Sequence, residues 1–94
     1  MGWYRVAVSA EQQAILQQKF FELFIKAGTP DDMAMFGELQ TEEPRELFFQ
    51  LPEGDISDVM VRLSGAEACT RPYKKLELMA GHNAAGERYR REEL

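Results

Sequence analysis

The sequence predicts one small α+β domain, and three observations carry this prediction. Segments typical of strands and of amphipathic helices alternate along the chain, with two strands between the two helices. The 94 residues are 45% hydrophobic and 29% charged, which is ordinary for a folded domain and too apolar for a disordered chain. A chain of this length buries roughly 60 to 65% of its unfolded surface. We therefore expect one domain over residues 1–86, followed by a charged tail or short helix over 87–94.

The first strand and the first helix have the clearest patterns. Residues 2–8, GWYRVAV, are rich in aromatic and β-branched residues and contain no breaker, which predicts a strand. Ser9 and Gln12 form a capping-box pattern at the start of a helix. Gly28 is a typical C′ residue and Pro30 prevents continuation, so the helix is expected to end there. Its apolar stripe comprises Leu16, Phe20, Leu23, Phe24 and Ala27, widened by Ile15, Phe21 and Ile25.

The middle and the end of the chain supply the remaining elements. A short helical turn is expected up to Met35, and then strands over 36–39 and 45–51, joined by the polar loop 40–44. Asp55, with Asp58 three residues later, predicts a capped helix that Gly65 ends. The apolar face of this helix comprises Ile56, Val59, Met60 and Leu63. Residues 73–80 alternate in polarity and predict the last strand.

This order, β-α-β-β-α-β, is that of the ferredoxin-like arrangement. Because βαβ crossovers are right-handed, we expect a four-stranded antiparallel sheet in the spatial order 4-1-3-2, with both helices on one face. The agreement is one of element order only, and this fold hosts many unrelated functions. The fold class alone therefore says little about chemistry.

Alternation along the strands assigns their side chains to the two faces of the sheet. The face against the helices is expected to receive Tyr4, Val6, Val8, Leu47, Phe49, Leu51, Leu76 and Leu78. The other face carries aromatics and a methionine among charges of both signs. Its residues are our candidates for contact with a partner or ligand: Trp3, Arg5, Phe48, Tyr73, Lys75 and Met79.

Two uses of that second face stay open. Self-association would cover Trp3, Phe48 and Met79, which are large apolar groups for a monomer to leave in water. Alternatively, an anionic small molecule could bind at a basic edge around Arg5 and Lys75, together with Arg71 and Lys74. Charge is unevenly spread, which either serves solubility alone or favours association. Residues 9–60 contain three Lys/Arg and eleven Asp/Glu, whereas the rest of the chain contains eight Lys/Arg and five Asp/Glu. An acidic part of one molecule could thus face a basic part of another.

Nucleic acid is a disfavoured partner. RNA-recognition modules share this element order and stack bases on aromatics of their first and third strands. The corresponding segment here, PRELFFQL (44–51), lacks the Lys/Arg-Gly start of their signature and places Glu46 on the binding face. A net charge of −5 also repels phosphate.

No set of residues predicts a cofactor, a metal or a catalytic centre. His82 is the only histidine, and Cys69 and dispersed carboxylates are the only further ligands at hand, without metal-binding spacing. Gly81 and Gly86 have the spacing of a phosphate-binding P-loop. Glu87 and Arg88 follow them, where that loop needs Lys and then Ser or Thr. We expect no cofactor and no metal.

The expected localisation rests on two kinds of segment that the sequence pattern does not indicate, a membrane span and a signal peptide. No apolar stretch approaches the roughly 20 residues needed to cross a bilayer, and the first residues do not read as a signal peptide. A single cysteine agrees with a reducing compartment. We therefore expect a cytoplasmic, non-catalytic module that acts through protein contacts, first of all as a homodimer. The alternative is a module that binds or converts an anionic small molecule.

Overall fold

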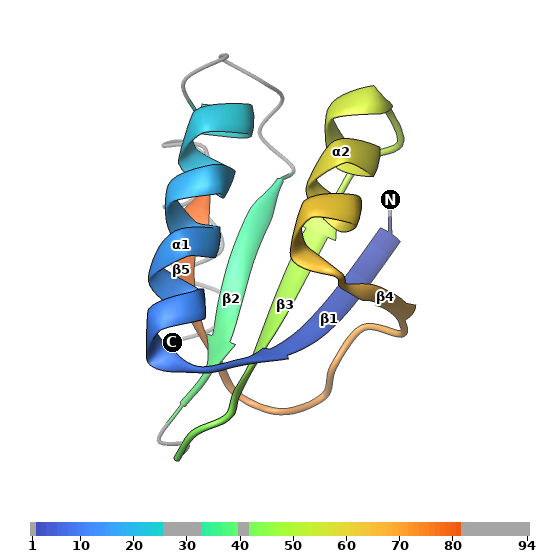
Figure 1. The fold of residues 1–94 in the computed structure, drawn as a ribbon. Coiled ribbons are helices and arrows are strands. Elements are labelled where there is room, and N and C mark those ends of the chain that lie inside the picture. The colour runs from blue at the N-terminus through green and yellow to red at the C-terminus, as the bar shows by residue number, and fades with distance from the viewer. Residues whose placement is uncertain (1, 26–32, 40–41, 82–94) are drawn as a thin grey trace.

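The computed structural model describes residues 2–25, 33–39 and 42–81, and in these residues a five-stranded antiparallel sheet carries two helices on one face (Figure 1). The elements are β1 (Gly2–Val8), α1 (Ala10–Phe20), the π-helical turn η1 (Phe21–Ile25), β2 (Ala34–Glu38), β3 (Arg45–Leu51), α2 (Asp55–Ser64), β4 (Glu67–Cys69) and β5 (Leu76–Gly81). The strands lie in the order β4-β1-β3-β2-β5. The α+β class, the antiparallel sheet and the two helices are confirmed, whereas the expected number of four strands is wrong.

The fourth strand of the sheet comes from a segment that the sequence pattern did not predict. We expected residues 73–80 to pair beside β1, but the three-residue β4 takes that place, opposite Trp3–Arg5. The strand that does form within 73–80, β5, pairs with β2 at the opposite edge. Three residues are too few to show an alternating pattern, which is why β4 escaped detection. Ala34 and Met35 also belong to β2 and not to the helical turn expected up to Met35.

The main core lies between the sheet and the helices. β1 and β3 pair along their whole length, from Gly2 opposite Leu51 to Val8 opposite Arg45, so directly opposed side chains share a face. Phe20 packs against Phe24 and Phe49, at ring-centroid distances of 5.0 and 6.5 Å. The strand residues predicted for this face are confirmed for β1 and β3: Tyr4, Val6, Val8, Leu47, Phe49 and Leu51.

The capping box predicted at the start of α1 is present. The Ser9 hydroxyl accepts a hydrogen bond from the Gln12 amide at 3.3 Å, and the Gln12 side chain accepts one from the Ser9 amide at 3.0 Å. Glu43, from the segment before β3, accepts a third bond from the Ala10 amide at 2.7 Å. The apolar stripe is narrower than expected, because Ile15 and Phe21 are 59% and 48% exposed.

The ends of α2 depend on two glycines. The residue before the helix is Gly54, and it makes no side-chain cap, so the capping role expected of Asp55 is wrong. Asp55 and Asp58 lie in the first turn, where a negative charge is favoured by the helix dipole. Gly65 ends the helix as predicted, with φ +71°, a conformation that costs glycine nothing and other residues much.

A bulge in β5 reverses the faces expected for the last strand. Met35 pairs with Ala80 and the next residue, Phe36, pairs with Leu78, so Met79 is an extra residue in β5. Met79 packs with the helix-side core and Leu78 with the opposite face, each contrary to prediction. Leu76 likewise lies on the face away from the helices. Gly37 of β2 makes room for the bulge: a Cβ there would lie 3.1 Å from the Met79 sulfur.

The face of the sheet away from the helices, here the helix-free face, has a hydrophobic cluster of its own. Its buried members are Ala34, Phe36, Phe48 and Leu76, with Trp3, Cys69 and Leu78 packed beside them. The connection 70–75 joins β4 and β5 at opposite edges of the sheet. Four strand spacings amount to about 19 Å, and six residues span at most about 20 Å. The connection therefore has little slack as it curves from one edge to the other (Figure 1).

Lys74 fastens this connection to the sheet. Its ammonium group donates to the carboxylates of Glu38 and Glu46, the latter at 3.2 Å, and lies 5.3 Å from the centre of the Phe48 ring. The hydrogen bond to Glu38, more than that to Glu46, raises the pKa of Lys74 against the opposing effect of lost hydration. The charged form of Lys74 is thus favoured in the folded chain.

Removing the cap of α1 will destabilise the domain. Ser9→Ala leaves the Gln12 amide without its acceptor, and we expect a loss of about 1 kcal/mol in the free energy of unfolding, typical of such caps. Urea denaturation followed by circular dichroism measures this loss. Thr70→Ala, at an exposed position in the 70–75 connection, is the control and should change stability little; equal losses in both variants would contradict the capping role.

Removing the charge of Lys74 will loosen the 70–75 connection. Because the side chain is 47% exposed, we expect Lys74→Met to cost less than about 1 kcal/mol and Lys75→Met, its exposed neighbour, to cost nothing measurable. Denaturation in low and high salt tests this, since salt should shrink the difference.

The same ion pairs predict a pH dependence. Because the pKa of Lys74 is raised in the folded chain, its contribution to stability is fully present below the unfolded-state pKa and is lost as pH rises through the folded-state pKa. If Lys74→Met still destabilised the chain above the folded-state pKa, the ion pairs would not be the cause.

Candidate functional site

The three candidates on β1 and β3 lie on the helix-free face, as predicted, but only Arg5 is exposed. Trp3 is half-buried and stacks on Phe36, with 5.6 Å between ring centroids. Phe48 is 3% exposed, with the Lys74 ammonium group over its ring. The Arg5 guanidinium lies 3.5 Å from the carboxylate of Glu67. This face is largely occupied by the chain itself.

The other three candidates do not join them on one surface. Tyr73 and Lys75 belong to the connection before β5 and not to a strand, and Tyr73 is fully exposed. Met79 packs on the helix side of the sheet. The six candidates therefore do not share a single surface.

The basic edge predicted to hold an anion is already partly neutralised. Lys74 is paired with Glu38 and Glu46, and Arg5 with Glu67. An incoming anion would have to displace these carboxylates, so the edge is a weaker anion site than its sequence indicated.

Cys69 is not activated as a nucleophile. Burial raises the pKa of its thiol; Arg5 acts in the opposite direction, and Glu46 and Glu67 raise it further. Since the thiolate is the reactive form, less of it is present at neutral pH than for an ordinary cysteine. Its half-buried side chain packs beside the hydrophobic cluster of the helix-free face.

The most unusual surface lies on the helix layer. The sequence places Ile56, Val59, Met60 and Leu63 on one apolar face of α2, and we expected this face in the core. Met60 does lie there, fully buried, and Val59 is half-buried. Beside Met60 the helix buries the polar Ser57, which is 6% exposed, and it leaves Ile56 and Leu63 at 39% and 56%. The apolar face of α2 is thus turned partly away from the sheet, with Met60 inside the core and Ile56 and Leu63 outside it.

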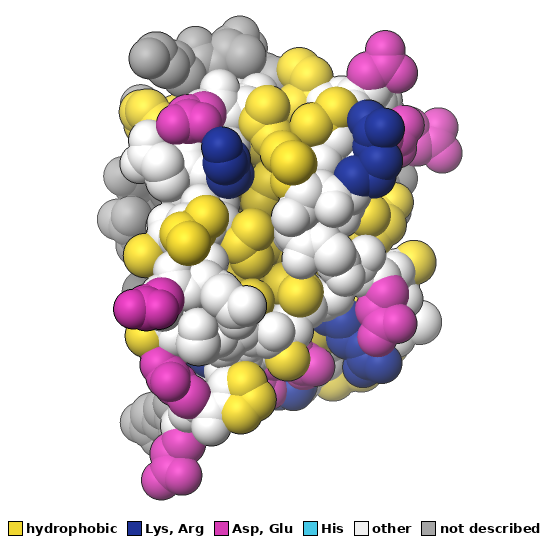
Figure 2. All heavy atoms as spheres, in the orientation of Figure 1, with side chains coloured by type: hydrophobic (Ala, Val, Ile, Leu, Met, Phe, Trp, Pro, Cys, Tyr) yellow, Lys and Arg dark blue, Asp and Glu magenta, His cyan; other side chains and the backbone are white. Residues whose placement is uncertain are grey.

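On the neighbouring helix, Ile15 is also exposed. It lines a hollow of about 220 Å³ between α1, β1 and the end of α2, together with Leu63. Hydrophobic side chains extend along the groove between the two helices over much of its length (Figure 2). We call the exposed residues Ile15, Ile56 and Leu63 the inter-helix strip.

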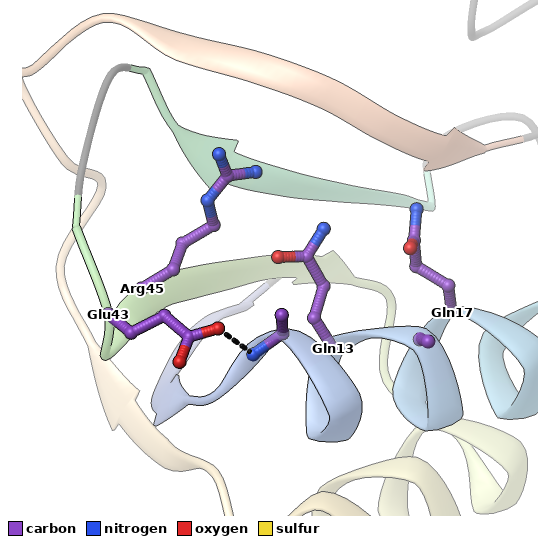
Figure 3. A pocket seen from close by; sticks show the side chains of 6 residues that line it. Gln13, Gln17, Glu43 and Arg45 are labelled. Atoms are coloured by element: carbon purple, nitrogen blue, oxygen red, sulfur yellow. Dashed lines mark hydrogen bonds between the residues drawn. The ribbon is translucent and has the colours of Figure 1, made fainter.

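A second hollow, of about 360 Å³, lies on the other flank of α1. Gln13 and Gln17 lie about 160° around the helix from Ile15, given 3.6 residues per turn. In Figure 3 their side chains extend from α1 in the same direction, toward the space that Arg45 of β3 also enters. Glu43 closes the end beside the first turn of α1, through its bond to the Ala10 amide. We call this hollow the polar pocket; it is lined by Ala10, Gln13, Ala14, Gln17, Glu43 and Arg45.

Sequence reasoning missed both surfaces, although part of the signal was there. The apolar stripe of α2 was found, but periodicity does not say whether a stripe faces a core or a partner. Gln13 and Gln17 stand at the i, i+4 spacing that places two side chains on one flank of a helix. Nothing local indicates that residues 43 and 45 would meet that flank, since this depends on the packing of α1.

The described residues, 2–25, 33–39 and 42–81, contain no cluster of metal-ligating side chains. No three His, Cys, Asp or Glu side chains gather there as a metal site would need. His82 and the tail 87–94 lie outside the described residues, as does the expected end of the first helix at Gly28.

In the described ranges, neither α1 nor α2 nor η1 has the length and apolar character needed to cross a bilayer.

Comparison with known proteins adds no assignment to this geometry. The chain matches no protein-family model, no curated protein and no solved structure.

Proposed function

We propose that this chain is a non-catalytic module that acts through protein contacts, and that its first partner is a second copy of itself. The observation that carries the proposal is the rotation of α2, which buries Ser57 and exposes Ile56 and Leu63. A helix gains most of its stability by burying its apolar face. A partner that covers this face would supply the burial that the sheet does not.

The apolar content of the inter-helix strip suits a helix-to-helix contact. Full burial of a Leu or Ile side chain is worth about 1.5 to 3 kcal/mol, and Ile15 and Leu63 are both more than half exposed. The hollow between them gives a partner side chain a place to insert, as the centres of well-packed interfaces do.

The charges around the strip favour a second copy over a strongly charged partner. Both signs are present on the exposed positions of both helices: Glu11, Lys19 and Glu22 on α1 and η1, and Asp58 and Arg62 on α2. In a two-fold dimer the same surface must match itself, which a mixed surface can do and a surface of one sign cannot. We therefore assign the proposed self-contact to the helices and not to the helix-free face, where the sequence first indicated it.

A charge placed in the strip will disrupt the dimer. We expect the unaltered chain to sediment as a dimer at micromolar concentration. Leu63→Glu and Ile15→Glu should each raise the dissociation constant at least about tenfold, because each loses more than about 1.4 kcal/mol of apolar burial. Sedimentation equilibrium over a range of concentrations measures the constants.

Tyr73→Glu is the matched control, since it adds the same charge at a fully exposed aromatic residue outside the helix layer. It should leave the dimer intact. A chain that stays monomeric at millimolar concentration would refute self-association. A dimer disrupted by Tyr73→Glu but not by Leu63→Glu would place the contact elsewhere.

A further inference from the structure

We propose that the polar pocket beside α1 binds a small zwitterion of amino-acid type, with the ligand carboxylate on Arg45 and its ammonium group toward Glu43. This site is separate from the inter-helix strip, because it lies on the opposite flank of α1. It also differs from the basic edge considered from the sequence, since it shares no residue with it. The proposal therefore does not depend on self-association.

The pocket contains polar side chains whose hydrogen-bonding capacity is unused. Across residues 2–25, 33–39 and 42–81, the side chains of Arg45, Gln13 and Gln17 make no hydrogen bond or ion pair. All three residues are half-buried. The half-buried guanidinium of Arg45 has lost part of its hydration without gaining a partner. A guanidinium group binds a carboxylate through two parallel hydrogen bonds, in bidentate geometry.

The sign of the charges selects among ligands. The pocket contains one cation, Arg45, and one anion, Glu43, so a ligand with one charge of each sign matches it. A dianion would meet repulsion from Glu43 and, next to it in the sequence, from Glu42. The two glutamine amides both donate and accept, which suits a ligand with further polar groups.

The first turn of α1 does not compete for the ligand. The amides of Ala10 and Gln12 are already engaged by Glu43 and Ser9, so the helix end offers an anion less than an uncapped one would. One carboxylate oxygen of Glu43 is used in this way, and the other is available to an ammonium group. The volume of about 360 Å³ is at the small end of the range for ligand pockets, in keeping with a single amino acid.

The test is a titration of the ¹⁵N-labelled full chain followed by its amide chemical shifts. The probes are L-glutamine and L-serine as zwitterions, and succinate as a dianion of comparable size. We expect saturable shifts confined to residues near 10–17 and 43–45 with at least one amino acid, and weaker binding of succinate. No saturable shift up to roughly 10 mM, well above the millimolar limit of weak specific binding, would overturn the proposal. Tighter binding of succinate would overturn it as well.

Variants locate the site. Arg45→Gln should weaken amino-acid binding about tenfold or more, the usual loss for a charged hydrogen bond. Arg71→Gln, which removes the same charge from the exposed 70–75 connection, should leave it unchanged. Gln13→Met keeps Arg45 in place and should weaken binding several-fold, so the proposal stays testable if Arg45→Gln unfolds the chain. Equal binding by the unaltered chain and by folded Gln13→Met and Arg45→Gln variants would refute the site.

Discussion

The sheet of this protein buries hydrophobic side chains on both of its faces, but helices cover only one of them. Phe20, Phe49 and Met60 fill the helix side, while Phe36 and Phe48 lie on the other. The second face is protected by the chain itself, through Trp3 and the 70–75 connection that Lys74 fastens to Glu38 and Glu46. The strand order, the position of β5 and the pairing of the basic residues all depend on this arrangement.

Much of the architecture could be predicted because it is encoded locally. The capping box at Ser9, the stripe through Leu16 and Phe20, and the alternation of β3 each follow from a few consecutive residues. The position of β5 could not be predicted in this way, since Leu76 and Leu78 suit either apolar face of the sheet. The bulge at Met79 depends on a space that Gly37 leaves on another strand, and no pattern within 73–80 contains that information.

The candidate surfaces show a similar division between local and non-local information. Alternation correctly placed Trp3, Arg5 and Phe48 on the face away from the helices, but it could not show that Lys74 would cover Phe48. The apolar stripe on α2 was recognised, and we assigned it to the core because polar residues usually prefer solvent. The burial of Ser57 is contrary to that preference. Both surfaces used in our proposals arise from how α1 and α2 are rotated on the sheet, which tertiary packing sets.

The edge-to-edge connection between β4 and β5 also has a consequence for the order in which the chain is made. During synthesis, β1, β2 and β3 emerge first and can pair, but the free edge of β2 and the rings of Phe36 and Phe48 stay uncovered until residues 74–81 follow. An unpaired strand edge beside exposed aromatic rings is a template for aggregation. Nascent chains that pause before Lys74 is made are therefore the ones most in need of a chaperone.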